Sequence, residues 1–250
     1  MNFEDILNME SKSNEVFLGY KDNTIDKYNI KDNCTIIITG STGTSKSIML
    51  HQILLQLINK HHPDTLKIVT INPTKVELKQ YRESKFSYNK DIQMVTNDLK
   101  DITNILDKRL ELFKENNVDN FDEYNNLDYK SLPLIVVAID EATDLLKEEN
   151  SDEKLRWIIN NCKKCGIILI LTTNNIYNKF FTKGYNTLAN IRISFDFVSS
   201  EDSKITNLID CDKLKLNEFL MELNNDYPEK KYNTFTFDYS IIDKILEKRY

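Results

Sequence analysis

The stretch TIIITGSTGTSKS, residues 35–47, decides the fold. Its β-branched run 35–39 has the composition of a strand buried in a parallel sheet, and the apolar residues between 48 and 58 recur at helical spacing. Between these two elements lies a loop that holds two of the chain's five glycines. A strand, a tight loop and a helix in this order predict a phosphate-binding loop, because the first backbone N–H groups of a helix face an anion.

The predicted nucleotide-binding residues are Gly40, Ser41, Thr42, Gly43, Thr44, Ser45, Lys46 and Ser47. In such a loop, Lys46 would bring its charge to the β- and γ-phosphates of ATP, and the Ser47 hydroxyl would ligate Mg²⁺. The usual pattern has Gly directly before the Lys, where this chain has Ser45. If that position needs a left-handed backbone, Ser costs about 1–2 kcal/mol more than Gly.

A pair of acidic residues follows the strongest apolar run, 134–139. Asp140 is suited to hold Mg²⁺, and Glu141 to polarise the attacking water as a general base. Asp140 could instead be the N-cap of a helix, but its pairing with the loop favours catalysis. A third polar segment, 172–174, follows the run 167–171. Since parallel strands end at one edge of a sheet, we expect the three segments to converge.

The remaining pattern predicts strands at 66–71, 92–95, 191–198 and 232–237, the last at a sheet edge, and helices at 99–113, 203–209 and the C-terminus. Strands that alternate with helices predict an α/β fold, with a mostly parallel sheet and helices on both faces. This order indicates a P-loop ATPase of the additional-strand type. We expect residues 1–30 to form an irregular lead-in or edge strand on the core, and residues 31–250 a single domain.

Composition narrows the class of protein. A net charge of −6 argues against a uniformly basic nucleic-acid coat, although a local basic surface stays possible. Apolar runs are too short for a membrane span, and the first residues are acidic and lack the apolar core of a signal peptide. Four cysteines do not make a disulfide framework, so we expect a reduced, cytoplasmic protein. The pair Cys162 and Cys165 has no second pair beside it, which favours coincidence over a zinc site.

Several blocks of sequence resemble the motor domain of the FtsK/SpoIIIE DNA translocases. The likeness runs from about Val16 to the C-terminus, and its blocks lie at 39–47, 71–78, 108–113, 120–125, 132–141, 166–170, 192–195 and 198–203. They are more specific than the loop alone, and their order matches.

This resemblance implies a RecA-like ATPase that assembles as a homo-oligomer, a hexameric or pentameric ring, and moves double-stranded DNA with ATP and Mg²⁺ in the cytoplasm of a bacterial host. Arg192 matches a family arginine that reaches the nucleotide of the neighbouring subunit. Asn174 stands where the family has a Gln that senses the γ-phosphate. Lys163 and Lys204 stand where Arg is usual, and Lys cannot make the same bidentate phosphate contact.

The family's membrane-spanning N-terminus and its C-terminal winged helix have no counterpart in the chain. We therefore expect a bare motor from a plasmid, conjugative element or phage, with a protein partner for anchoring or DNA loading. Two alternatives stay open. One is a degenerate nucleotide-binding adaptor or regulator without turnover; the other is a secretion-type motor that moves protein. The blocks at 75–78 and 120–125 favour DNA over protein as the cargo.

Overall fold

The computed structural model describes residues 1–71, 78–88, 99–128, 131–142, 145, 150–174, 176, 188–197, 199–224 and 229–247. The expected strand at 92–95 lies outside these residues, and so do residues 72–77 of the family block 71–78.

Five parallel strands form the half of the sheet that carries the predicted site. In sheet order they are β4 (Leu66–Ile71), β5 (Leu134–Ile139), β6 (Ile167–Thr173), β3 (Thr35–Thr39) and β7 (Ile191–Ser194). Every residue of these strands is buried, which explains why their sequences are apolar without alternation. Because β6 lies between β3 and β5, the sheet has the additional-strand arrangement, and the predicted fold class is confirmed.

Four antiparallel strands continue the same nine-stranded sheet beyond β7. They are β8 (Glu218–Leu223), β9 (Lys230–Asn233), β1 (Glu15–Lys21) and β2 (Thr24–Asn29). Of the two expectations for residues 1–30, the edge strand is confirmed and the irregular lead-in is wrong: residues 15–29 form a hairpin whose turn, Asp22 and Asn23, has positive φ at both positions. Since this hairpin covers β9, the predicted edge strand near 232 is an interior strand, and β2 is the edge.

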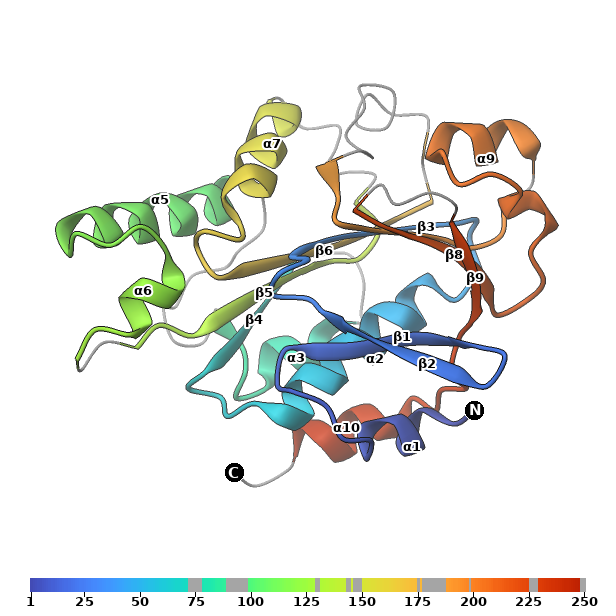
Figure 1. The fold of residues 1–250 in the computed structure, drawn as a ribbon, viewed down its shortest axis with the longest axis horizontal. Helices are drawn as coiled ribbons and strands as arrows, with labels where there is room; N and C mark the ends of the chain where they lie inside the picture. Colours follow the sequence, from blue (N-terminus) through green and yellow to red (C-terminus); the bar gives the residue numbers. More distant parts are fainter. Residues whose placement is uncertain are drawn as a thin grey trace.

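Helices cover both faces of the sheet (Figure 1). On one face lie α1 (Phe3–Leu7), α2 (Lys46–Lys60), α3 (Lys79–Glu83) and α10 (Ser240–Leu246), and on the other lie α5 (Leu99–Glu115), α7 (Ser151–Asn161) and α9 (Ser200–Thr206). The short α6 (Phe121–Asn125) follows α5, and a 3₁₀ turn, η4 (Cys211–Lys213), follows α9. Neither α7 nor β8 was predicted from the sequence.

Several predicted elements have shifted ends, among them the strand expected at 232–237, which is β9 at 230–233. Strand β7 stops at Ser194, four residues short of the expected end, because its partner β3 stops at Thr39. Helix α9 spans 200–206 instead of 203–209. It starts early because the Ser199 side chain accepts a hydrogen bond from the backbone N–H of Asp202, and it ends at Asn207, whose φ is 59°.

Helix α2 is the centre of the core on its face of the sheet. Its residues Leu50, Ile53 and Leu54 are fully buried, and each such side chain contributes about 1.5–3 kcal/mol of hydrophobic free energy. The buried Gln56 side chain acts as a strand partner, because it accepts from the backbone N–H of Phe17 at 2.8 Å and donates to the Phe17 carbonyl at 2.9 Å. These bonds join the N-terminal hairpin to the helix that begins at the predicted phosphate loop.

Candidate functional site: the loop 40–47 and two strand ends

The loop between β3 and α2 has the backbone that its glycines predict. Gly40 has φ of 149°, and a Cβ there would lie 2.8 Å from the Cβ of Phe195. Gly43 has φ of 87°, and a Cβ there would meet nothing within 4 Å. The first glycine therefore allows close packing, and the second leaves an open side on the loop. The segment after β7 holds the loop, since the N–H of Ser41 donates to the Asp196 carbonyl at 2.9 Å.

Ser45 does not have the left-handed backbone that would make serine less favourable than glycine at this position. Its φ is −76° and its ψ is 22°, so the position does not need a left-handed backbone and accepts an ordinary L-residue. The Ser45 hydroxyl donates to Oδ1 of Asn217 at 3.1 Å. The serine that interrupts the usual pattern thus connects the loop to the turn before β8.

Lys46 and Ser47 begin α2, where the helix N-terminus is most positive. The Lys46 ammonium lies over the loop, 2.7 Å from the Ser41 carbonyl oxygen and 3.5 Å from Thr44 Oγ1. Its side chain is largely buried, so its charge is little screened by water. Together with the first N–H groups of α2, which have no intrahelical acceptor, this ammonium suits a bound polyphosphate.

Asp140 meets Ser47 across the edge of the sheet. The Ser47 hydroxyl lies 3.3 Å from both carboxylate oxygens of Asp140. The hydroxyl of Thr172, at the end of β6, donates to Asp140 Oδ1 at 2.6 Å. A hydroxyl and a carboxylate are the oxygen ligands that Mg²⁺ prefers, so these residues fit the predicted metal.

Glu141 has a backbone conformation that is unusual for its type, with φ of 59°. Residues at and just after the end of β6 hold it there: its N–H donates to Thr172 Oγ1 at 2.9 Å, and its Oε1 accepts from Thr173 Oγ1 and from the N–H of Asn174, each at 3.2 Å. A strained residue that is fixed by several hydrogen bonds is typical of functional sites. The carboxylate of Glu141 is thereby directed by the neighbouring strand.

Asn174 contacts both sides of this arrangement. Its backbone N–H donates to Glu141, and its side-chain Nδ2 donates to Thr42 Oγ1 in the loop at 3.0 Å. The expected convergence of the three segments is therefore present in the structure, and Asn174 connects the loop to the acidic residue.

Arg192 is the predicted site residue that the structure places elsewhere. It lies on β7, is 7% exposed, and forms an ion pair with Glu222, its cross-strand partner on β8. Its Nη1 donates to the Thr206 carbonyl at 3.4 Å. In this structure the guanidinium is buried and paired within its own chain, and the assignment of Arg192 as an intersubunit arginine stays a prediction.

His51 lies one helical turn after Ser47 on α2 and packs in the core next to the site. Its Nδ1 is 2.9 Å from the Tyr81 hydroxyl, and its ring stacks on Phe237 with ring centroids 6.0 Å apart. Burial lowers the pKa of His51 to about 4, although the charge of Asp140 opposes this. The imidazole is therefore neutral near pH 7.

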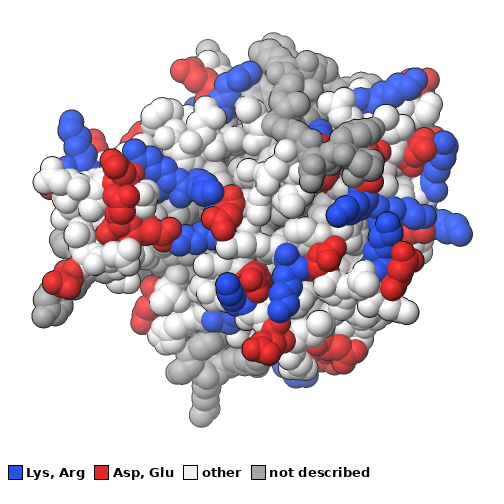
Figure 2. All heavy atoms as spheres, in the orientation of Figure 1, with Lys and Arg blue, Asp and Glu red and all other residues white. Residues whose placement is uncertain are grey.

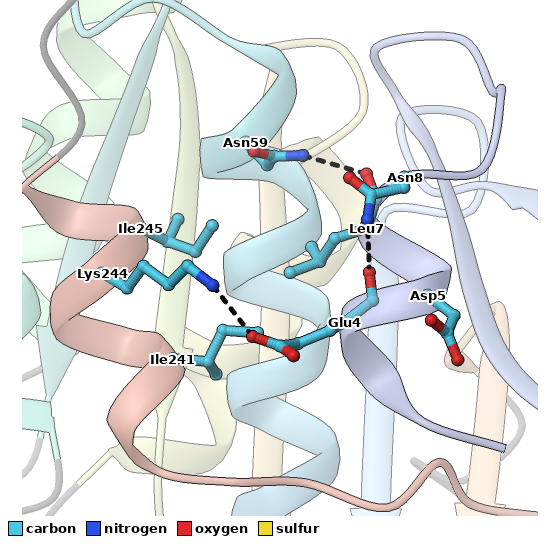
Figure 3. A pocket seen from close by; sticks show the side chains of 8 residues that line it. All are labelled: Glu4, Asp5, Leu7, Asn8, Asn59, Ile241, Lys244 and Ile245. Carbon is cyan, nitrogen blue, oxygen red and sulfur yellow. Dashed lines mark hydrogen bonds and ion pairs between the residues drawn. The ribbon is translucent and has the colours of Figure 1, made fainter.

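A hollow of about 250 Å³ lies far from the loop, between α1, α2 and α10 (Figure 3). Its polar groups pair with one another: Lys244 Nζ lies 3.0 Å from Glu4 Oε1, and Asn59 Nδ2 lies 3.1 Å from the Leu7 carbonyl. These contacts join the first and last helices to the core.

The two cysteines of the Cys162–Cys165 pair have different neighbours. The sulfur of Cys162 is 2.8 Å from that of Cys34, whereas the sulfur of Cys165 is 3.9 Å from the Leu106 carbonyl. Within the described part of the chain, no three His, Cys, Asp or Glu residues form a metal-binding group. Nor does any described helix have the length and apolar character needed to cross a membrane.

The fold and the loop together define the class of protein, an α/β P-loop ATPase fold of the additional-strand type. The sequence profile of the FtsK/SpoIIIE family matches residues 10–129, and over this segment the chain belongs to that family, as the resemblance predicted. DNA translocase SftA of Bacillus subtilis is 29% identical over 223 residues, which are 84% of this chain and 23% of SftA. The chain spans about a quarter of the length of the curated relatives it matches.

Several solved structures share the fold, and two of them illustrate it. The pCW3 conjugation coupling protein TcpA, in its monomer form with ATPγS, has a TM-score of 0.71 at 22% identity, covering 95% of this chain and 71% of that one. The cytoplasmic domain of the type VII secretion ATPase EccC of Thermomonospora curvata has a TM-score of 0.78 at 14% identity, covering 99% and 33%.

The roles of two residues at the site, Thr172 and Asn217, could not be predicted from the sequence. Thr172 was expected near the site as part of the polar segment after β6, but only the structure shows its hydroxyl between Asp140 and the Glu141 backbone. Asn217 precedes a strand that was not predicted, and nothing in the pattern connects it to Ser45.

Proposed function

We propose that this chain is the ATP-hydrolysing motor of a double-stranded DNA translocase, acting in plasmid transfer, segregation or genome packaging. The observation that carries the proposal is the meeting of Ser47, Asp140 and Glu141 at one edge of the sheet beside the loop. Membership of the FtsK/SpoIIIE family supports DNA as the cargo.

The residues divide the chemistry of phosphoryl transfer among them. The backbone N–H groups of α2 and the Lys46 ammonium would hold the β- and γ-phosphates and stabilise the negative charge that grows on their oxygens. Mg²⁺, held by Ser47 and Asp140, would neutralise further charge. Glu141 would accept a proton from the water that attacks the γ-phosphorus, and ADP and phosphate would leave.

Asn174 would set the position of this reaction relative to the loop. Its contacts with Thr42 and Glu141 join the loop to the carboxylate, which would then lie on the side of the predicted γ-phosphate. An amide that touches both groups can respond to the loss of that phosphate, which supports its predicted role as a sensor.

Contacts with DNA would be made by local basic groups. Figure 2 shows Lys and Arg side chains mixed with Asp and Glu over the face seen in Figure 1. Such a surface does not attract DNA as a whole, which agrees with the net charge of −6. A ring of several copies around the duplex would gather a few phosphate contacts from each subunit, and these position DNA without reading its sequence.

The test is ATP turnover with and without linear duplex DNA, at protein concentrations that allow assembly. DNA should stimulate the wild-type rate, and Lys46→Ala and Glu141→Gln should each lower it by about 100-fold or more. The exposed residues Lys12 and Glu10 offer matched controls, since Lys12→Ala and Glu10→Gln should leave turnover unchanged.

Other outcomes would select another function. Turnover that survives both site substitutions would sink the catalytic assignment. ATP binding without turnover, even on DNA, would favour a nucleotide-binding adaptor. The fold shared with the secretion ATPase EccC keeps a protein cargo as the second candidate, and stimulation by unfolded polypeptide but not by DNA would favour it.

A further inference from the structure

Two cysteine sulfurs lie in contact at the edge of the sheet opposite the loop 40–47. Cys34 directly precedes β3, and Cys162 is the C-cap residue of α7. Their sulfur atoms are 2.8 Å apart, although 128 positions separate the two residues in the chain. Both are free thiols in this structure, and both are buried. Since a disulfide bond has an S–S length of about 2.05 Å, a small further approach would join them.

The same strand fixes the backbones of both cysteines. The carbonyl of Cys34 accepts a hydrogen bond from the N–H of Leu169 at 2.7 Å, and the carbonyl of Cys162 accepts from the N–H of Ile167 at 2.8 Å. Leu169 and Ile167 both belong to β6, which is buried along its whole length. Because the two cysteines are anchored to one strand, their sulfurs stay next to each other, and bond formation needs little movement of the backbone.

The groups around the two sulfurs favour a thiolate at Cys162. Its sulfur lies 2.8 Å from the Cys34 sulfur and 3.4 Å from the Thr35 hydroxyl, and both groups can donate a hydrogen bond to it. The bond from Cys34 lowers the pKa of Cys162, although burial opposes this, and the same contact raises the pKa of Cys34. A thiolate beside a neutral thiol is the arrangement of an attacking and a resolving cysteine.

The other two cysteines have different surroundings. The sulfur of Cys165 contacts the Leu106 carbonyl at 3.9 Å, and that of Cys211 contacts the Leu208 carbonyl at 2.9 Å. Burial raises the pKa of each of these two thiols to about 11. Both are therefore neutral near pH 7, and a neutral thiol reacts slowly with oxidants. Oxidation should thus select the pair Cys34 and Cys162.

An oxidant reaches this pair through the end of α7. Cys162 itself is fully buried, but the next residue, Lys163, has a side chain that is 66% exposed. The last turn of a helix opens locally at a lower free energy than a central strand does. Such an opening exposes the Cys162 sulfur to a small molecule while Cys34 stays next to β3. Oxidation therefore proceeds at the rate of this opening and is slow.

We propose that Cys34 and Cys162 are a site of reversible oxidation, at which hydrogen peroxide converts two thiols into an intrachain disulfide. The Cys162 thiolate attacks one oxygen of the peroxide, the O–O bond breaks, and the second oxygen takes a proton and leaves as water. The Cys34 sulfur loses its proton and attacks the sulfenic acid formed at Cys162. The S–O bond then breaks, and hydroxide leaves with that proton as water. Two thiols are oxidised, one peroxide is reduced to two waters, and a thiol reductant reverses the change.

The disulfide stabilises the sheet and leaves the phosphate site unchanged. It closes the long segment of chain between β3 and α7, which restricts the unfolded state more than the folded one. The whole of β3 separates Cys34 from Gly40, a distance of about 20 Å at the rise of an extended strand. The loop 40–47 therefore keeps its geometry in both redox states.

The experiment treats the folded chain with hydrogen peroxide, alkylates the remaining thiols after unfolding, and maps the disulfide by mass spectrometry of a non-reduced digest. The wild type should lose two of its four thiols and give peptides joined through Cys34 and Cys162. Its Tm should rise by about 5–10 °C and return to the starting value with dithiothreitol. Cys165→Ala and Cys211→Ala are the matched controls, which should form the same link with the same rise in Tm.

Other products would overturn the inference. A link between Cys162 and Cys165, a link between two chains, or four thiols that all remain after treatment would each do so. A rise in Tm that persists in Cys162→Ala would also contradict it, since that variant cannot form the link. Lys46→Ala should be oxidised like the wild type, because the phosphate site lies at the other edge of the sheet. Loss of turnover in Lys46→Ala therefore tests the proposed function alone.

Discussion

The two sides of the loop 40–47 are built on different principles. On the β5 and β6 side, short polar side chains follow directly on buried parallel strands, and hydrogen bonds between them fix Asp140 and Glu141. On the β7 and β8 side the sheet becomes antiparallel, and the loop is flanked by the turn before β8, which is held by Asn217 and by contacts with β9. The first side carries the two carboxylates suited to a reaction, whereas the second side is a wall beside the loop.

This difference shows which functional residues can be predicted from the sequence. Residues at the ends of parallel strands point to chemistry because the topology brings such ends together. A wall formed by a turn depends on long-range contacts, and its residues have no distinctive spacing. Substitutions on the first side should therefore change the rate of turnover, and those on the second side affinity or stability.

The largest effect is expected at Arg192, on the second side. Breaking a buried ion pair leaves an uncompensated charge, so Arg192→Met should lower the free energy of unfolding by about 3–5 kcal/mol. The double variant Arg192→Met with Glu222→Leu should recover most of this loss. Urea denaturation measures both. If Arg192→Met kept its stability but lost turnover, Arg192 would instead act on the nucleotide of a neighbouring subunit in an assembled ring.

On the first side, Thr172→Val should reduce the rate of turnover. The change removes the hydroxyl that orients Asp140 and accepts the N–H of Glu141, so kcat should fall about 10–100-fold while the Kd for ATP stays within about threefold. Thr172→Ser keeps the hydroxyl and should retain most of the wild-type rate. Equal rates for the Val and Ser variants would show that this hydroxyl does not position the carboxylates.

His51, on α2, should make the stability of the fold decrease in acid. Its folded pKa, about 4, is below the unfolded value of 6.5, so the unfolded state binds more protons between these values. The stability present above pH 6.5 is therefore lost as the pH falls toward 4, and the loss from this residue between pH 7 and pH 5 is about 2 kcal/mol. His51→Gln, which can still accept from Tyr81, should flatten this part of the stability profile measured by denaturation. A profile that keeps its slope would assign the acid sensitivity to other groups.

The smallest effect is expected at Ser45, where the two sides meet. Ser45→Gly removes one hydrogen bond to Asn217, worth about 1 kcal/mol, so the Kd for ATP should rise about fivefold without a change in kcat. Ser45→Ala should behave in the same way, because the lost group is the hydroxyl. A large gain in kcat for the glycine variant would instead mean that Ser45 restrains the motor.

Sequence reasoning identified most of the parallel half of the sheet and the catalytic side. The strands before Gly40 and Asp140 were predicted with their observed ends, because strands buried on both faces have continuous apolar runs. The hairpin at 15–29 was missed, although Asp22 and Asn23 between apolar alternations are a recognisable turn signal. Strand β8 was missed because its apolar run, 219–221, is short and is flanked by Glu218 and Glu222.

By itself the sequence determined the strand, loop and helix of the phosphate site, the acidic pair, and the family to which residues 10–129 belong. These are local features, in which neighbouring residues supply both the backbone and the chemical groups. Tertiary structure decided the rest: the φ that makes Ser45 harmless, the burial of Arg192 against Glu222, and the approach of Asn217 to the loop. The last two depend on strands far apart in the chain lying side by side, and no spacing within a segment encodes such contacts.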